Sequence, residues 1–342
     1  MKDNKLPVFI AAAVALLILP LVAQLFGNAW VRIIDIALLY VLLALGLNIV
    51  VGYAGLLDLG YVAFYAVGAY IFGLLASGHL TETFPAIAAM FPQGLHMPIL
   101  LVIPLAAGVA GLAGVLLGAP TLRLRGDYLA IVTLGFGEII RVFLNNLDHP
   151  VNITNGPKGI GPIDSMHFFG FDLGQKHELF GLEIPPVTNY YYVFLALVVA
   201  SVVICYRLER SRIGRAWMAI REDEIAAKAM GINTRNMKLL AFGMGATFGG
   251  VAGVMFAGYQ SFITPEAFSL QESIMIVAMV VLGGIGHIPG VIVGAVMLAA
   301  LPEVLRYVAG PLQQMTDGRL DASILRQLLI ALAMIAIMLS RP

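Results

Sequence analysis

The stretch RLERSRIGRAWMAIREDEIAAKAMGINTRNMK, residues 207–238, separates two apolar runs, 190–206 and 239–259. It holds 8 of the 20 lysines and arginines of the chain but only four acidic residues. Positive charge between two apolar runs is typical of a loop on the cytoplasmic side of a membrane. The sequence therefore predicts a membrane protein that is oriented by this stretch, which we call the basic loop.

The second half of the basic loop carries the signals of a short helix. Three consecutive acids stand where a helix N-terminus favours negative charge: Glu222, Asp223 and Glu224. Lys228 lies where the C-terminal end favours positive charge. Gly231 then predicts a left-handed residue that ends the helix.

The same short helix is predicted to have an apolar strip. Ile225 and Ala229, and likewise Ala226 and Met230, are four residues apart, so each pair shares a face. Orientation alone requires a basic loop but no such helix, and an amphipathic helix can also lie on the bilayer surface. We favour the hypothesis that the helix docks onto a cytoplasmic partner.

Composition supports a membrane protein throughout. Of the 342 residues, 60% are hydrophobic and 12% are charged, against about 25% in a typical soluble domain. The formal net charge is zero, so no global field attracts nucleic acid. Cys205 is the only cysteine, which excludes an intrachain disulfide and a cysteine metal cluster. Neither a cofactor nor a metal is expected.

The distribution of apolar residues predicts an all-α polytopic integral membrane protein, a bundle of about 9–10 transmembrane elements. The predicted spans are 6–26, 33–52, 55–77, 99–119, 128–144, 190–206, 239–260, 274–301 and 323–339. The run 274–301 is interrupted by glycines and proline, so it is either one long broken helix or two short elements. Backbone broken at membrane depth must be buried in protein or line a wet cavity.

Charge counting supports one orientation. With the basic loop inside, the cytoplasmic segments hold 12 lysines and arginines and the external segments hold three. The external segments then include 78–98 and 145–189. The segment 145–189 is rich in turn residues and is expected to be either a cap that binds a partner or a passive lid.

Motifs for catalysis are missing from the sequence. It contains no G-x-x-x-x-G-K-[ST] phosphate loop, no H-E-x-x-H and no G-x-S-x-G. We therefore expect a chain that is not an enzyme and that draws energy from a separate subunit or from an existing gradient.

Four stretches carry a family resemblance. REDEIAAKAMGIN (221–233) resembles the "EAA" loop of ABC-importer permeases, with Ile225 where the family pattern has Glu and the acid one residue earlier, at Glu224. Residues 126–146 with 152–163, and also 46–70 and 280–295, are similar to LivM-type permeases of branched-chain amino-acid ABC importers. The likeness runs from about 33 to 339.

The resemblance implies a single transmembrane permease domain over 1–342 in the bacterial inner membrane, importing leucine, isoleucine, valine or related amino acids. It implies two ATP-binding subunits docked on 222–231, a LivH-like second permease subunit and a periplasmic substrate-binding protein; no nucleic acid is expected. Relatives of this kind also carry urea and short amides. An ion-coupled secondary transporter using Asp58 or Glu138 is the alternative from a different class.

Polar and glycine residues inside predicted spans are candidates for the substrate path: Asn48, Gly52, Gly55, Asp58, Gly283 and Gly286. Broken helix ends with free N–H and C=O groups suit a zwitterionic amino acid. The alternative is that the glycines, with Gly60 and Gly68, only permit close helix packing, and that Asp58 caps a helix. Glu138 and Arg141 are three apart and are expected to pair.

Overall fold

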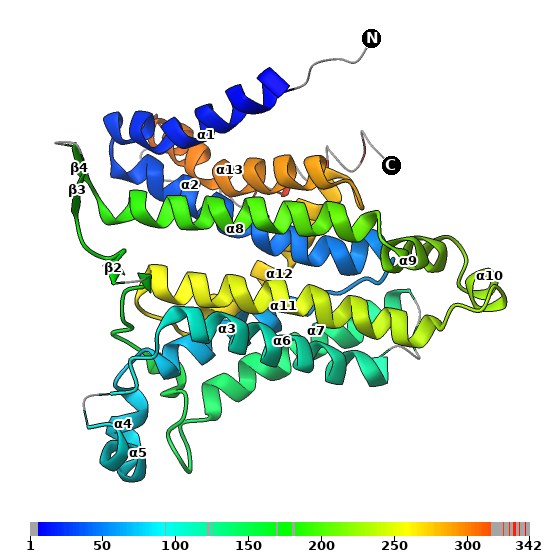
Figure 1. Cartoon of the computed structure of the whole chain (residues 1–342), viewed down its shortest axis with the longest axis horizontal. Helices are drawn as coiled ribbons and strands as arrows, with labels where there is room; N and C mark the ends of the chain where they lie inside the picture. The colour runs from blue at the N-terminus through cyan, green and yellow to red at the C-terminus, as the bar shows by residue number, and fades with distance from the viewer. Residues whose placement is uncertain are drawn as a thin grey trace.

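The computed structural model describes residues 6–315 apart from 93, 122, 123, 125, 169, 180 and 181, together with single positions between 324 and 339. Long helices lie side by side in a bundle (Figure 1). Four of them are long and apolar enough to cross a membrane: Asn28–Tyr53, Ile99–Thr121, Pro186–Glu209 and Thr234–Gln260. Four further apolar helices are shorter. The predicted all-α polytopic membrane fold is confirmed.

The helices follow in this order: α1 (Leu6–Leu25), α2 (Asn28–Asn48), α3 (Val62–Leu75), α4 (His79–Thr83), α5 (Pro85–Met90), α6 (Ile99–Thr121), α7 (Asp127–Asn146), α8 (Pro186–Glu209), α9 (Arg212–Glu222), α10 (Glu224–Ala229), α11 (Thr234–Gln260), α12 (Leu270–Gly283) and α13 (Ile288–Met315). A π-helical turn, Ile49–Tyr53, extends α2, and 3-10 turns span Gly156–Lys158 and Pro265–Phe268. Strands β1 (His167–Phe168) and β2 (Phe171–Asp172), and β3 (His177–Leu179) and β4 (Leu182–Ile184), form two antiparallel pairs.

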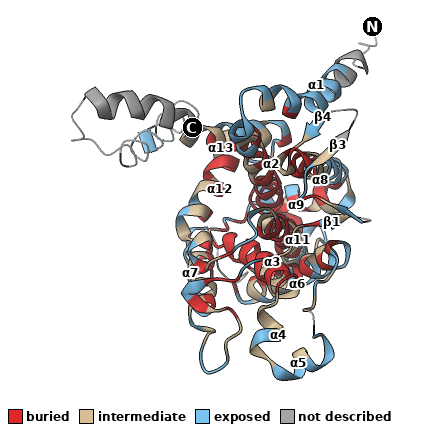
Figure 2. Cartoon of the chain, turned by 90° about the vertical axis from the view of Figure 1, so that its left-hand side faces the viewer, coloured by how far each residue is buried: buried red, intermediate tan, exposed pale blue. Residues whose placement is uncertain are grey.

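Helix α11 lies at the centre of the bundle and packs against α2, α3 and α6. Buried residues gather in α2, α3 and α11, whereas α1 is largely exposed (Figure 2). Glycines bring the central backbones together, because a Cβ added at Gly68 would stand 2.0 Å from Gly250 O. A Cβ at Gly60 would stand 2.0 Å from Thr133 O on α7. The predicted close packing at Gly60 and Gly68 is thus confirmed.

Two predicted spans are broken. The run 55–77 is helical only from Val62, because the chain leaves the π-helical turn at Ala54 and turns at Gly55, where φ is +68°. The prediction of one span beginning at residue 55 is wrong on this point. The run 274–301 forms two helices, α12 and α13, separated by a turn with positive φ at Gly284 and Gly286. The run 323–339 lies largely outside the described residues.

Segments predicted on opposite sides of the membrane lie at opposite ends of the bundle. Helices α9 and α10 are at one end, and α4, α5 and the strands are at the other (Figure 1). The segment 145–189 folds onto its end of the bundle: Ile160 and Ile263 exchange backbone hydrogen bonds of 2.9 and 3.1 Å, and the Ile163 N–H donates to Ser261 O. Which end faces the cytoplasm stays a prediction from the charges.

Candidate functional site

The apolar side of α9 packs against the N-terminal end of α11. Ser211 begins the helix, since its Oγ accepts a hydrogen bond from the Gly214 N–H (3.1 Å). Gly214, Trp217 and Ile220, three residues apart, are its buried positions. The Trp217 indole is fully buried and its Nε1–H donates to Met237 O at 2.7 Å. The hydrogen bond from this buried ring fixes the position of α9 on α11.

Helix α10 begins with acidic residues and is followed by a glycine, as predicted. Asp223 Oδ1 accepts hydrogen bonds from the backbone N–H groups of Ile225 (2.8 Å) and Ala226 (3.0 Å). Gly231 follows the helix with φ at +85°. The assignment of Glu222 to the start of this helix is wrong: Glu222 ends α9, because Asp223 has extended backbone (φ −153°, ψ 108°) between the two helices.

The apolar strip of α10 faces outward. Ile225 is 71% exposed and Met230 is 84% exposed, and Ala226 and Ala229 are exposed beside them. Helix α10 projects beyond the rest of the bundle at the far right of Figure 1. Both predicted pairs therefore lie on a free surface of the chain, which we call the α10 face.

A buried ion pair holds the other side of α10. Lys238 at the start of α11 is only 6% exposed, and its Nζ lies 2.7 Å from Glu224 Oε1. An ammonium group in such a place requires a negative partner, because burying it unpaired is costly. Glu224 therefore has a positioning role that tethers α10 to α11.

The candidate path residues do not form one site. Asn48, Gly52 and Gly286 meet at a junction, where the Gly286 N–H donates to Asn48 Oδ1 at 2.9 Å. Arg221 of α9 reaches the same place, and its Nη1 donates to Gly52 O at 2.6 Å. Gly55 packs on Arg221, since an added Cβ would stand 2.9 Å from Arg221 Cγ.

Gly283 lies beside this junction. A Cβ added to it would stand 2.3 Å from Gly290 O, so Gly283 lets α12 and α13 approach at the backbone. The junction thus draws together a broken end of α2, the α12–α13 turn and one side chain of the basic loop.

Asp58 lies apart from the junction, in a small cavity of its own. Its Oδ1 accepts a hydrogen bond from the Gly60 N–H (2.9 Å), whereas Oδ2 is buried without a hydrogen-bond partner among the described residues. The Thr133 side chain also interacts with Asp58, while its hydroxyl donates to Ala130 O and accepts from the Leu59 N–H.

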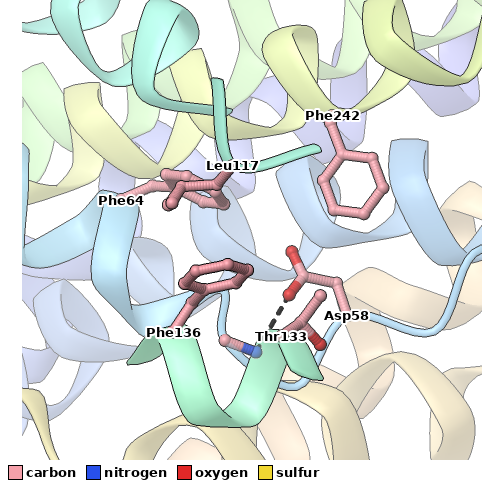
Figure 3. Close-up of a pocket in the computed structure, with 7 residues that line it drawn as sticks. Asp58, Phe64, Leu117, Thr133, Phe136 and Phe242 are labelled. Carbon is pink, nitrogen blue, oxygen red and sulfur yellow. Dashed lines mark hydrogen bonds between the residues drawn. The ribbon is translucent and has the colours of Figure 1, made fainter. Parts of the chain in front are cut away.

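Figure 3 shows the Asp58 carboxylate directed into a space between side chains of α3, α6, α7 and α11. The cavity is about 10 Å³, enough for one water molecule. Its lining is Asp58, Gly60, Phe64, Leu117, Thr133, Phe136 and Phe242. The expectation that Asp58 caps a helix is wrong, because its bond to Gly60 closes a turn before α3, whose first residues receive no side-chain cap. Asp58 also presents an oxygen to an apolar cavity.

A larger cavity, of about 310 Å³, opens at the end opposite α10. His96 Nδ1 and Asp164 Oδ2 lie within hydrogen-bond distance of each other on its wall. Behind it, Asp172 accepts hydrogen bonds from the Ser165 hydroxyl (2.6 Å) and the Gly174 N–H (2.8 Å). Burial alone would raise the pKa of Asp172, but these hydrogen bonds hold it below the usual value. The Asp172 carboxylate is therefore ionised at neutral pH.

The predicted Glu138–Arg141 pair is present on α7. Arg141 Nε donates to Glu138 Oε2 at 3.0 Å, and Arg141 Nη1 donates to Glu266 at 3.3 Å. Two carboxylates around one guanidinium neutralise charge where α7 meets the Pro265–Phe268 turn. We therefore interpret these ion pairs as structural.

Arg221 and Lys238 are residues that sequence reasoning missed as site residues. Both appear in the basic loop as ordinary positive charges. Arg221 is 169 residues from Gly52 in the chain, so no local pattern connects the two. The sequence indicated only that Arg221 lies next to a candidate site, because it directly precedes the three acids of the predicted short helix.

These features define a class: a multi-pass helical membrane protein with glycine-broken elements and an amphipathic helix exposed at one end. The profile of one family, described as "Branched-chain amino acid transport system / permease component", matches residues 29–338. The chain belongs to this permease family.

Individual relatives agree with the family match. The chain is 43% identical over 306 residues to a high-affinity branched-chain amino acid transport system permease protein LivM of Escherichia coli (strain K12), covering 86% of this chain and 68% of the relative. A LivM of Salmonella typhimurium is 44% identical over 81% of this chain, which spans 63% of that relative's length. A LivH permease of Salmonella typhimurium is 28% identical over 76% of this chain and 79% of the relative. No solved structure matches.

Proposed function

We propose that this chain is a non-catalytic permease subunit of an ABC importer that moves branched-chain amino acids across the bacterial inner membrane. The transport system named for the family and for the LivM relatives supports the substrate class. The single structural observation that carries the proposal is the exposed α10 face, held from behind by Trp217 and Lys238. An apolar helix face presented at the end of a membrane bundle suits a protein partner that pushes on it.

Separate ATP-binding subunits are the proposed occupants of the α10 face, over residues 222–231. The bilayer surface is the competing occupant, because the segment exposes carboxylates, Glu222 and Asp223, together with basic groups, Arg221 and Lys228. An anionic membrane surface attracts basic segments and repels carboxylates. A protein groove with complementary charge accommodates both the apolar strip and the acids.

Two further partners complete the proposed importer. The similarity to LivH permeases supports pairing with a second, LivH-like permease subunit. A substrate-binding protein would deliver the amino acid at the opposite end, where 78–98 and 145–189 surround the cavity of about 310 Å³. In this proposal 1–342 is one permease domain that needs no cofactor, binds no nucleic acid and is not itself an enzyme.

The cavity at Asp58 is proposed to lie on the substrate path. A carboxylate oxygen facing Phe64, Leu117, Phe136 and Phe242 offers an ammonium partner and an apolar wall together. Those are the two chemistries of a branched-chain amino acid. At about 10 Å³ the cavity holds no amino acid, so in this state the path is closed.

Charge insertion on the α10 face tests the proposal. Ala226→Asp and Ala229→Glu place a carboxylate on the exposed strip without filling any buried space. We expect each to reduce copurification of the ATPase subunit by at least about tenfold, since burying an unpaired charge in an interface costs more than about 1.4 kcal/mol. Insertion of the chain into the membrane should not change.

Met218→Glu is the matched control, because Met218 is 38% exposed in the same loop but belongs to α9 and not to the α10 face. It should retain the ATPase. Full retention of the ATPase by both α10 variants would refute docking at this helix.

A further inference from the structure

Three segments that are distant in sequence are joined at Gly52. Arg221 Nη1 donates to Gly52 O (2.6 Å), across 169 residues of sequence. Asn48 Oδ1, one turn before Gly52, accepts from the Gly286 N–H (2.9 Å), across 238 residues. The basic loop, the broken end of α2 and the α12–α13 turn are therefore connected by two hydrogen bonds, a group that we call the clasp.

The clasp leaves no room for side chains at its glycines. A Cβ added at Gly52 would stand 2.1 Å from Asn48 Oδ1 and 2.8 Å from the Gly286 nitrogen. At Gly286, where φ is +86°, it would stand 2.9 Å from Arg221 Nη1. These glycines are required for contact between protein groups, and no open space for a substrate remains among them.

The charge of Arg221 suits the group that it binds. Gly52 lies in the π-helical turn that ends α2, and beyond Tyr53 the chain is no longer helical. The last carbonyl groups of a helix lack intrahelical donors and carry partial negative charge. A guanidinium donor satisfies one of them and fixes the place where the helix stops.

The clasp is linked both to α10 and to the segment that carries Asp58. Arg221 is two residues from Asp223, which caps α10, and α9 is held rigid by Trp217. On the other side, Gly52 leads into the non-helical residues 54–61, which include Asp58. Helix α12 binds the same segment further along, where the Ser273 hydroxyl donates to Leu59 O at 2.5 Å.

We infer that Arg221 is a positioning residue that transmits displacement of α10 to the two breaks at Gly52 and Gly286, and through them to the walls of the Asp58 cavity. This inference rests on the proposed function, since it assumes that a partner moves α10. It reassigns Asn48, Gly52, Gly55 and Gly286 from substrate contact to transmission. Arg221 itself touches neither substrate nor ATP.

The test measures docking, ATP hydrolysis and uptake in one preparation, the complete importer purified from membranes and reconstituted in liposomes. In Arg221→Gln, which removes an exposed side chain from the surface of α9, the ATPase subunit should remain bound and hydrolyse ATP. Leucine taken up per ATP hydrolysed should fall by about tenfold, in line with the loss of one charge-assisted hydrogen bond. Arg221→Lys, which keeps the charge and a donor, should recover part of the ratio.

Arg215→Gln is the matched control. Arg215 is an exposed arginine of the same helix whose Nη1 also donates to a carbonyl, Arg210 O at 2.8 Å, but it does not reach the clasp. Its uptake per ATP should equal that of the unmodified chain. Asn48→Ala, which removes the second hydrogen bond of the clasp, should reproduce the Arg221→Gln ratio.

Two results would overturn the inference: an unchanged uptake per ATP in Arg221→Gln, or loss of the ATPase subunit from that variant, which would make Arg221 part of the docking surface. Failure of the docking proposal has a different signature, because Ala226→Asp and Ala229→Glu would then retain the ATPase whatever Arg221→Gln does.

Discussion

Asp58 has a structural contact and a proposed functional role in the same side chain. Its Oδ1 binds the Gly60 N–H and stabilises the turn before α3, which any Asp or Asn could do. Its Oδ2 is buried with no hydrogen-bond partner among the described residues. A buried carboxylate oxygen without a partner is costly, and this one faces a cavity in which it could accept a hydrogen bond from an ammonium group.

Asp58→Asn separates the two roles. The amide keeps an oxygen for the Gly60 N–H and nearly the same volume, so folding should be unaffected. If the carboxylate pairs with the ammonium of the substrate, kcat/KM for leucine uptake should fall by about tenfold to a hundredfold, the value of a hydrogen bond to a charged group. Uptake by the complete importer in liposomes is the measurement.

Asp35→Asn provides the control for Asp58→Asn. Asp35 is also a fully buried aspartate, and both of its carboxylate oxygens lack a hydrogen-bond partner among the described residues, but it belongs to α2 and does not line the cavity. Its variant should transport normally. Equal uptake by Asp58→Asn and the unmodified chain would leave Asp58 only the structural role of closing the turn at Gly60.

At the element scale, the helices of the bundle are held by backbone contact at glycine. Apolar side chains gain little by leaving lipid for a helix interface, so close van der Waals contact must supply the association. Helices α3 and α11 meet where an added Cβ would stand 2.0 Å from Gly250 O at Gly68, and 2.1 Å from Tyr65 O at Gly253. One methyl group there forces two helices apart.

Gly68→Ala should therefore destabilise the chain by about 3 kcal/mol, the upper part of the range for overpacking. Thermal unfolding of the purified protein in detergent gives the measurement. Gly108→Ala on α6 is the matched control, because no atom lies within 4 Å of its added Cβ. It should change stability by no more than about 1 kcal/mol, and in the stabilising direction. A Gly68 variant as stable as the Gly108 variant would contradict backbone contact as the basis of packing.

At the scale of the whole molecule, the two ends of the bundle are chemically different. One end presents α10 and the basic loop, and the other presents α4, α5 and the strand pairs (Figure 1). Lysine and arginine accumulate on the cytoplasmic side of membrane proteins. The whole mechanism requires that the α10 end face the cytoplasm.

Thiol labelling tests this orientation with a low background, because the single native cysteine, Cys205, is buried. Met230→Cys on the α10 face and Lys176→Cys at the opposite end both replace exposed residues. A membrane-impermeant maleimide, added to cells whose outer membrane is permeabilised and whose inner membrane is intact, should label Lys176→Cys and not Met230→Cys. Inside-out vesicles should reverse the pattern, and labelling of Met230→Cys from outside would contradict the orientation.

Much of the fold was predictable because its signals are local. Hydropathy over about 20 residues distinguishes membrane helices whatever they pack against. The acids at 222–224 and Gly231 predicted a short helix that ends at a glycine, and α10 has that form. The structure adds that Ile225 and Met230 are exposed. Even here the assignment of Glu222 failed, because it depended on the backbone angles of Asp223.

By itself, then, the sequence determined the membrane class, the helical bundle and a protruding amphipathic helix, since caps, periodicity and charge act between near neighbours. Tertiary structure alone decided that Arg221 meets Gly52 and that Asn48 meets Gly286. It also decided that four helices enclose Asp58. Glycines and polar residues inside apolar runs look alike in sequence. Their roles depend on which distant backbone groups come within about 3 Å of them when the helices pack.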